Sequence, residues 1–169
     1  MNPQEWPKKL TSGGETFKKR VDNPTVFRAY MFAKMPTLGI TTAYLDELDV
    51  TSSRVALPYG WTTRDLFGRV SNAAILAAAE SCALSLLVLN IRNQGAALTP
   101  RVKAISMECL EDNKEDMSFE VEDGEAFGAF VAEAVANGDI VLRDLTVLGH
   151  TASGKLTHRV HIEWVLAPK

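Results

Sequence analysis

The stretch from residue 73 to residue 89 limits the folds open to this chain more than any other feature. Its only charged residue is Glu80, and Ser71 or Asn72 just before it is a good helix N-cap. A helix that is apolar all round must be buried on all sides. In a chain of 169 residues, we therefore expect a sheet that curls around this helix.

The same stretch is the one candidate for a membrane span, and two properties argue against that reading. It is short for a bilayer, which needs about 20 apolar residues, and Glu80 lies near its middle. A charge at the centre of a membrane costs at least about 2.5 kcal/mol. Residues 1–6 also lack the basic and apolar segments of a secretory signal. We expect no membrane span and a cytoplasmic protein.

The remainder of the chain can supply the sheet. Apolar and polar residues alternate along several segments, as in half-buried strands. The segments are 41–50, 54–59, 103–109, 117–121, 140–148 and 159–166. In the segment 140–148, Ile140, Leu142 and Leu148 occupy even positions.

Helical spacing occurs before these strands and once between them. Residues 16–34 read as two short helices, with Pro24 starting the second, and residues 124–138 read as an amphipathic surface helix. We expect a flexible lead-in at residues 1–15 and a single domain at 16–169. The predicted class is α+β: an antiparallel sheet wrapped around a long central helix, with extra N-terminal helices and one inserted helix.

Composition excludes some classes of partner. The formal net charge is -3 and no strongly basic block occurs, whereas nucleic-acid binding needs concentrated positive charge. Cys82 and Cys109 form no CxxC pattern, which favours two small residues in a reducing compartment over a structural disulfide. His158 and His161 are three apart on a predicted strand and point to opposite faces. We expect no nucleic-acid partner, no metal and no cofactor.

Glu80 is the strongest candidate for chemistry. Burial disfavours the charged form of a carboxyl group and raises its pKa, which suits a general base or acid near neutral pH. The alternative is a structural role, in which Glu80 is partly exposed or binds a backbone amide or an arginine. The residue alone leaves the two readings equally open.

The loop before the helix is the second candidate. A helix N-terminus presents unpaired amides and a positive dipole end, which can hold an oxyanion or a phosphate. Gly68 allows close backbone approach, and Ser71, Asn72 and Ala73 open the helix. An ordinary capped helix start is the commoner alternative. Glu80 lies two to three turns further along, so in a dimer the N-terminus of one helix can face the acid of the other.

Residues 65–81 resemble the signature of hotdog-fold thioesterases, especially the phenylacetyl-CoA-thioesterase-like branch. That signature reads Asn-x-x-Gly-x-x-His-Gly-Gly, six residues, then Asp or Glu on the central helix. Gly68 and Glu80 match it in type and spacing. The order of elements over residues 24–167 also resembles a poorly characterised subfamily of that fold. The departures are Asp65 in place of Asn, Ser71 in place of His, and Asn72 and Ala73 in place of Gly-Gly.

The resemblance implies hydrolysis of a thioester carried by CoA or an acyl-carrier protein. Glu80 would be the general base or nucleophile, the amides of Asn72 and Ala73 would hold the oxyanion, and Asp65 would position water. It also implies a homodimer, or a tetramer of dimers, whose sheets join edge to edge. Further candidates are substrate contacts at Gly68 and Ser71, an acyl-pocket role for Trp61, and CoA-phosphate contacts from Arg64, Arg69, Arg92 and Arg101.

Two other functions fit the same fold. The altered residues at 71–73 favour a non-catalytic acyl-CoA sensor or scaffold, whereas the retained Glu80 favours the enzyme. A dehydratase ranks last, because it would need a catalytic histidine where Ser71 stands.

Overall fold

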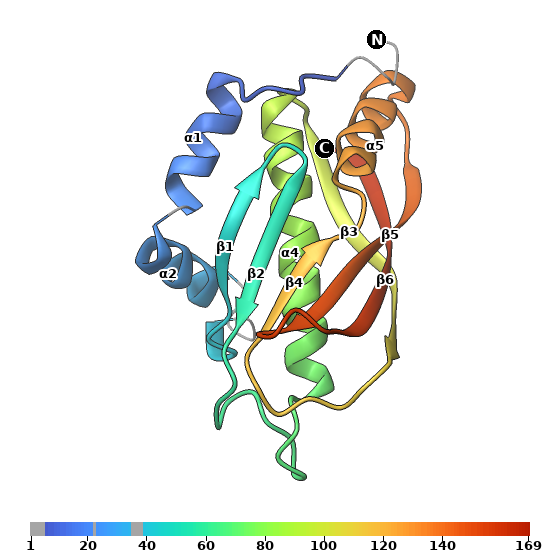
Figure 1. The fold of residues 1–169 in the computed structure, drawn as a ribbon. Coiled ribbons are helices and arrows are strands. Elements are labelled where there is room, and N and C mark those ends of the chain that lie inside the picture. Colours follow the sequence, from blue (N-terminus) through green and yellow to red (C-terminus); the bar gives the residue numbers. More distant parts are fainter. Residues whose placement is uncertain (1–5, 22, 35–38) are drawn as a thin grey trace.

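The computed structural model describes residues 6–21, 23–34 and 39–169, which form an antiparallel sheet around one long helix (Figure 1). The order of elements is the one predicted, including the division of the first helices at Pro24 and the helix inserted between two strands. The elements are α1 (Ser12–Val21), α2 (Pro24–Lys34), β1 (Tyr44–Asp49), β2 (Ser52–Leu57), α4 (Asn72–Asn93), β3 (Leu98–Cys109), β4 (Met117–Val121), α5 (Gly124–Asn137), β5 (Val141–Thr151) and β6 (Leu156–Pro168).

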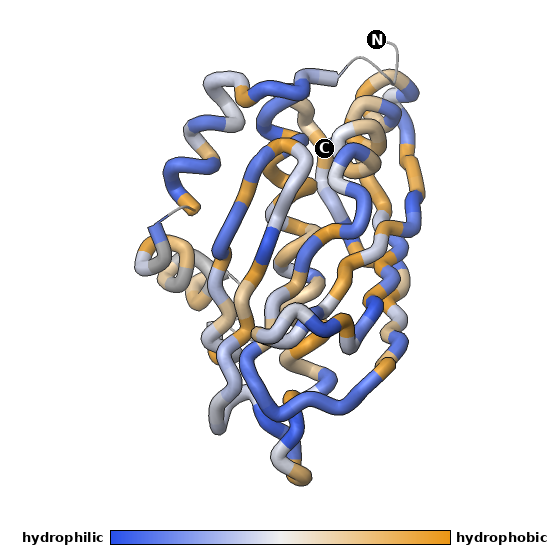
Figure 2. Tube along the Cα trace, in the orientation of Figure 1, coloured by the Kyte–Doolittle hydropathy of each residue, from blue (hydrophilic) through white to orange (hydrophobic). Residues whose placement is uncertain are grey.

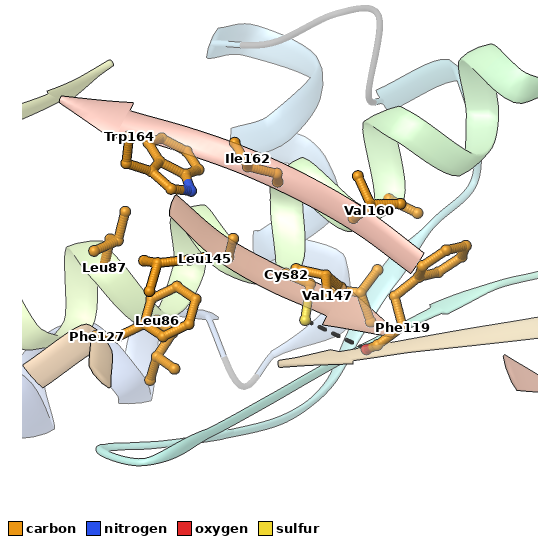
Figure 3. Close-up of a cluster of buried hydrophobic side chains, with 14 of the residues drawn as sticks. Cys82, Leu86, Leu87, Phe119, Phe127, Leu145, Val147, Val160, Ile162 and Trp164 are labelled. Carbon is orange, nitrogen blue, oxygen red and sulfur yellow. Dashed lines mark hydrogen bonds between the residues drawn. The ribbon is translucent and has the colours of Figure 1, made fainter. Parts of the chain in front are cut away.

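Helix α4 is the buried helix that the apolar stretch predicts. It begins after the N-cap Ser71, whose hydroxyl oxygen accepts the amide of Ala74 at 3.2 Å. Near its middle, the Cys82 thiol donates to the carbonyl oxygens of Ser53 and Phe119. Figure 3 shows the bond to Phe119. Burial raises the pKa of this thiol to about 12, so Cys82 stays protonated and serves as a core residue.

The described strands form one sheet in the order β1-β2-β4-β5-β6-β3, with every neighbouring pair antiparallel. The apolar set predicted for the last strand is buried against α4 as expected, and it comprises Val160, Ile162, Trp164 and Leu166. Figure 3 shows Trp164 on the same side of the core as Leu87 of α4, and Val160 near Phe119 and Val147. The predicted fold, a sheet wrapped around a central helix, is therefore confirmed.

One expectation about residue placement was wrong. The even positions Ile140 and Leu142 are exposed, at 56% and 46%, and β5 instead buries odd positions. The register with β6 explains this, because Val147 pairs with Val160 and Leu145 pairs with Ile162. Directly opposed residues in a sheet share a face, so the odd positions of β5 face the core.

Residues 6–11, expected to belong to a flexible lead-in, make buried contacts. The Asn93 side chain accepts the amide of Thr11 at 2.7 Å and donates to the carbonyls of Pro7 and Lys9 at 3.0 and 3.1 Å. Trp6 is buried against Gly128 of α5. Helix α1 starts at Ser12, before the expected boundary at residue 15.

Helix α4 is long and apolar enough to cross a membrane by length and composition, with a mean hydropathy of 2.0. However, 72% of the 18-residue window that meets the criterion is buried within the protein. In Figure 2 the helix is covered by the sheet on one side. Burial to this extent is typical of a core helix.

Candidate active site

Glu80 lies on a stripe of α4 that the described residues leave half-buried. Residues at positions 76, 77, 80, 84 and 88 are partly exposed, whereas most of the others between 74 and 91 are buried. These positions recur at the spacing of one helix face. The glutamate therefore stands on an uncovered strip of an otherwise enclosed helix.

The Glu80 carboxyl group has no hydrogen bond or ion pair with any other described residue. Desolvation by burial raises its pKa above the ordinary value of 4.5. A structural role would require Glu80 to bind a backbone amide or an arginine, and no such contact occurs in the described part of the chain. A half-buried carboxyl group with a raised pKa and free oxygens can accept a proton from an incoming water molecule.

The N-terminus of α4 is shaped by the loop before it. Gly68 has φ +72°, in the left-handed region that favours glycine, and its carbonyl accepts the Tyr59 hydroxyl at 2.6 Å. Ser71 caps the helix at the third amide, that of Ala74. Asn72 and Ala73 are exposed, and no acceptor for their amides occurs among the described residues. Two helix-terminal donors thus remain open toward solvent.

Asp65 is bound up within this loop. Its carboxylate accepts the amides of Phe67 at 2.8 Å and Arg69 at 2.9 Å, and it pairs with the Arg69 guanidinium at 2.9 Å. The amide of Arg69, with the other donors, lowers the pKa of Asp65 below 3.8. Arg69 also reaches Asp112 at 3.1 Å, so this predicted phosphate contact is engaged by two carboxylates.

Within one chain, the candidate residues form two separate groups. Glu80 lies eight positions beyond Asn72 in the sequence, which corresponds to about 12 Å along the helix axis. One carbonyl group cannot contact both. The loop group, which includes Asp65, Gly68, Ser71, Asn72 and Ala73, is therefore apart from Glu80 in the single chain.

Trp61 lies at the surface, in the loop that leads into α4. Its side chain is 81% exposed, and Leu66 and Phe67 in the same loop are 99% and 74% exposed. In Figure 1 this loop projects below the sheet, and Figure 2 shows hydrophobic colour at its tip. The acyl-pocket role predicted for Trp61 has no support from the single chain.

Two residues that hold the loop, Thr63 and Asn113, were missed from the sequence, and so was the burial of His158. Thr63 is fully buried, and its carbonyl accepts the amide of Ser71 at 2.7 Å, while the carbonyl of Asn113 accepts the amide of Val70 at 2.9 Å. His158, buried on β6, has its pKa lowered by desolvation. A threonine shortly after Gly60 only weakly predicts a turn. Nothing in the local sequence predicts the roles of Asn113 and His158, because their contacts are with residues distant in sequence.

The described residues contain no candidate site for a metal ion. No group of three or more His, Cys, Asp or Glu side chains there could hold a metal ion. His158 and His161 lie on opposite faces of β6: the first is buried, and the second is half-buried and bonded to Thr146.

Comparison with solved structures identifies the fold. A protein of unknown function from Pseudomonas aeruginosa, described as a probable thioesterase, matches 86% of this chain and 97% of its own, with 17% identity and a TM-score of 0.70. A thioesterase from Haemophilus influenzae matches 95% and 94%, with 11% identity and a TM-score of 0.59. A protein of unknown function from Chlorobaculum tepidum matches 93% and 97%, with 10% identity and a TM-score of 0.74.

These likenesses confirm the predicted resemblance at the level of fold. The antiparallel sheet around α4, with its order of strands, is the hotdog arrangement, and solved structures named as thioesterases share it. No protein-family model and no curated protein matches the sequence.

Proposed function

We propose that the protein hydrolyses acyl thioesters of CoA or an acyl-carrier protein, with Glu80 as its catalytic acid–base. The observation that carries this proposal is the half-buried Glu80 carboxyl group, which has a raised pKa and no partner among the described residues. Fold neighbours named as thioesterases support the same class of reaction. A cytoplasmic location and a homodimer complete the proposal.

The dimer follows from the distance between the two groups of candidates. In an antiparallel pair of α4 helices that cross near residue 76, Glu80 of one copy faces Asn72 and Ala73 of the other. The stripe at this crossing consists of partly exposed Leu76 and Ala77, and a small residue permits close approach of two helices. Each complete site then takes its acid from one copy and its amides from the second.

The β3 edge of the sheet supports the same assembly. Strand β3 ends the strand order and pairs only with β6 within the described residues. An unpaired edge offers a row of amides and carbonyls to another strand. We propose that β3 of a second copy pairs there, which would join two sheets into one and bring the two α4 helices to the same side.

The proposed chemistry needs no group beyond these residues. The Glu80 carboxylate takes a proton from water as the water oxygen attacks the thioester carbonyl carbon. The carbonyl oxygen becomes an oxyanion held by the amides of Asn72 and Ala73. When the C–S bond breaks, the oxyanion collapses to the carboxylic acid, and the proton on Glu80 passes to the thiolate leaving group.

The rival function is acyl-thioester binding without turnover, and one observation favours it. Asp65, which would position water, has its carboxylate occupied by Phe67 and Arg69 of its own loop. A site with no residue to orient water would bind substrate and release it unchanged. The same assay separates the two functions.

That assay measures thiol release from short, medium, long and aromatic acyl-CoAs with wild type and Glu80→Gln. We expect Glu80→Gln to fold normally and to lose about 10²–10⁴-fold in kcat. Glu122→Gln, on an exposed glutamate, is the matched control and should keep full activity. For wild type, kcat/KM should rise with pH as the Glu80 carboxyl group loses its proton. Because the pKa of Glu80 is raised, this rise should lie above pH 4.5. Saturable binding with no turnover across the panel would establish the rival function.

A further inference from the structure

A cavity of about 590 Å³ lies between α1, α2 and the C-terminal half of α4. This volume is in the range of small-molecule sites, about 300–1,000 Å³. Figure 1 shows α1 above α2 along the β1 edge of the molecule, away from the tip of the loop before α4. The cavity is thus separate from the amides at the N-terminus of α4.

The lining of the cavity is amphipathic and positively charged. Its apolar part is formed by Phe17, Val21, Phe27 and Val88. The charged part is Arg20 and Arg92, and none of the described lining residues is acidic. Neither guanidinium has an ion pair or hydrogen bond with another described residue. The two arginines therefore favour an anionic group in the ligand, and the apolar walls favour a hydrocarbon chain.

One end of the cavity is closed by tight helix packing. A Cβ atom at Gly13 would lie 2.6 Å from the carbonyl oxygen of Arg92, so α1 meets α4 there with no room for a side chain. Asn93 fixes this end further, because its carbonyl accepts the Thr11 hydroxyl at 2.9 Å. The pocket wall is consequently part of the folded domain.

The same cavity continues the half-buried stripe of α4. Glu80, Leu84, Val88 and Arg92 follow one another at intervals of four residues, and neighbours at this spacing lie along one helix face. The axial distance from Glu80 to Arg92 is about 18 Å. An extended acyl chain that starts beside Glu80 can therefore pass Leu84 and enter the cavity at Val88.

From these observations we infer that the cavity binds a medium-chain aliphatic carboxylate, with the chain on the apolar walls and the carboxylate at Arg20 and Arg92. The carboxylate can have two sources: a free fatty acid, or the far end of an acyl thioester that carries a second carboxyl group. Only the second source rests on the proposed function. Arginine suits this ligand because its fork of donors matches a carboxylate.

The first test is binding of decanoate, measured by isothermal titration calorimetry on the full chain. We expect saturable binding to wild type and an affinity at least about tenfold weaker for Arg20→Gln/Arg92→Gln. The matched control is Lys18→Gln/Lys19→Gln, which removes two cations from α1 that do not line the cavity. Equal affinity of the two double variants, or no saturable binding to wild type, would overturn the inference.

A second pair of variants tests the position of the chain. Val26 lines the cavity and is 49% exposed, so Val26→Glu can fold and place a carboxylate beside the ligand. Thr25→Glu, on the exposed neighbour, is its control. Decanoate binding should be lost in Val26→Glu and kept in Thr25→Glu, and binding kept in both would place the ligand elsewhere.

Turnover distinguishes the two sources. If the cavity holds the far end of a substrate, Val26→Glu should raise KM for decanoyl-CoA, and Arg20→Gln/Arg92→Gln should slow only the CoA thioester of the ten-carbon dicarboxylic acid. If the ligand is a free acid, both variants should hydrolyse thioesters as wild type does. If no thioester is hydrolysed by wild type, the proposed function fails, while the decanoate result still decides the cavity.

Discussion

The Asp65 carboxylate and the Arg69 guanidinium meet at 2.9 Å, and the same carboxylate accepts the backbone amide of Arg69 at 2.9 Å. One acid therefore closes the loop that leads into α4 by both charge and backbone hydrogen bonding. A carboxylate can accept about four hydrogen bonds, and donors from Phe67 and Arg69 use these positions. This arrangement supports a loop-shaping role for Asp65 over the positioning of water.

The Asp65→Asn variant separates these two roles. The amide oxygen of asparagine can still accept the amides of Phe67 and Arg69, so we expect the loop to keep its shape and thioester turnover to stay near the wild-type level. Asp65→Ala removes every one of these acceptors and should lower both activity and the melting temperature. A loss of 100-fold or more in kcat for Asp65→Asn, with an unchanged melting temperature, would restore the water-positioning role.

Acid should weaken the same loop. The pKa of Asp65 is lowered below 3.8 in the folded chain, so its contribution to stability is present above about pH 3.8 and is lost as the pH falls through the folded-state pKa. Proteolysis at the exposed residues Leu66 and Phe67 should accelerate over that interval. In Asp65→Asn, cleavage at this loop should show a weaker dependence on pH, and an unchanged dependence would contradict the assignment.

His158 predicts a second pH dependence, at less acidic pH. Desolvation lowers the pKa of this buried histidine below 6.5, so the unfolded chain binds its proton more readily than the folded chain. Stability is therefore full above about pH 6.5 and declines as the pH falls toward the folded-state pKa. The measurement is the melting temperature between pH 8 and pH 5.

The matched variants for this effect are His158→Phe and His161→Phe. Removing His158 should flatten the decline in melting temperature, although it also removes the contact between His158 Nδ1 and the Thr157 hydroxyl at 3.0 Å. His161→Phe leaves His158 in place and should retain the wild-type slope. Identical slopes for the two variants would exclude His158 as the source.

Trp6 and Gly128 predict a coupling between the N-terminal segment and α5. A Cβ atom at Gly128 would lie 2.5 Å from two ring atoms of Trp6, so Gly128→Ala must displace the indole, at a cost of about 1–3 kcal/mol in the free energy of unfolding. In a Trp6→Ala background the same change should cost much less. Additive effects in this double-mutant cycle, measured by urea denaturation, would show that the two residues do not interact.

The sequence predicts best the features that depend on local pattern. The apolar run of α4 and the alternation around Ile162 in β6 each fit only one kind of element. The N-cap of α4 is Ser71, the first of the two candidates, Ser71 and Asn72. The αL residue Gly138, which closes α5 with φ +65°, has an equally local cause in the Asn137-Gly138 pair.

The features that were missed depend on contacts between distant segments. In β5 both the even and the odd positions carry apolar side chains, for example Leu142 and Leu145. Only the pairing with β6 decides which of the two sets is buried. The anchoring of Trp6 depends on Gly128, far along the chain. At the candidate site, Glu80 stands out in the sequence as a lone charge. The engagement of Asp65 by Arg69 is the exception among the missed features, because it is local and depends on the conformation of the turn between the two residues.

The proposed two-copy site predicts that two inactive variants restore each other. Glu80→Gln removes the acid. Ala73→Pro removes one proposed oxyanion donor, and proline is tolerated in the first turn of a helix because the lost amide has no partner there. In a mixed dimer, the copy with Ala73→Pro supplies Glu80 and the copy with Glu80→Gln supplies the Ala73 amide, so one of the two sites is complete.

Random mixing of the two variants makes half of the dimers mixed, each with one working site. We expect about a quarter of the wild-type activity from an equimolar, co-refolded mixture, while each variant alone stays inactive. Ala77→Arg, at the proposed crossing of the α4 helices, should prevent this recovery by placing two cations together, and light scattering should then give the 18.5 kDa of one chain. Ala136→Arg, on the exposed face of α5, is the control. No recovery in a mixture shown to contain mixed dimers would refute the shared arrangement.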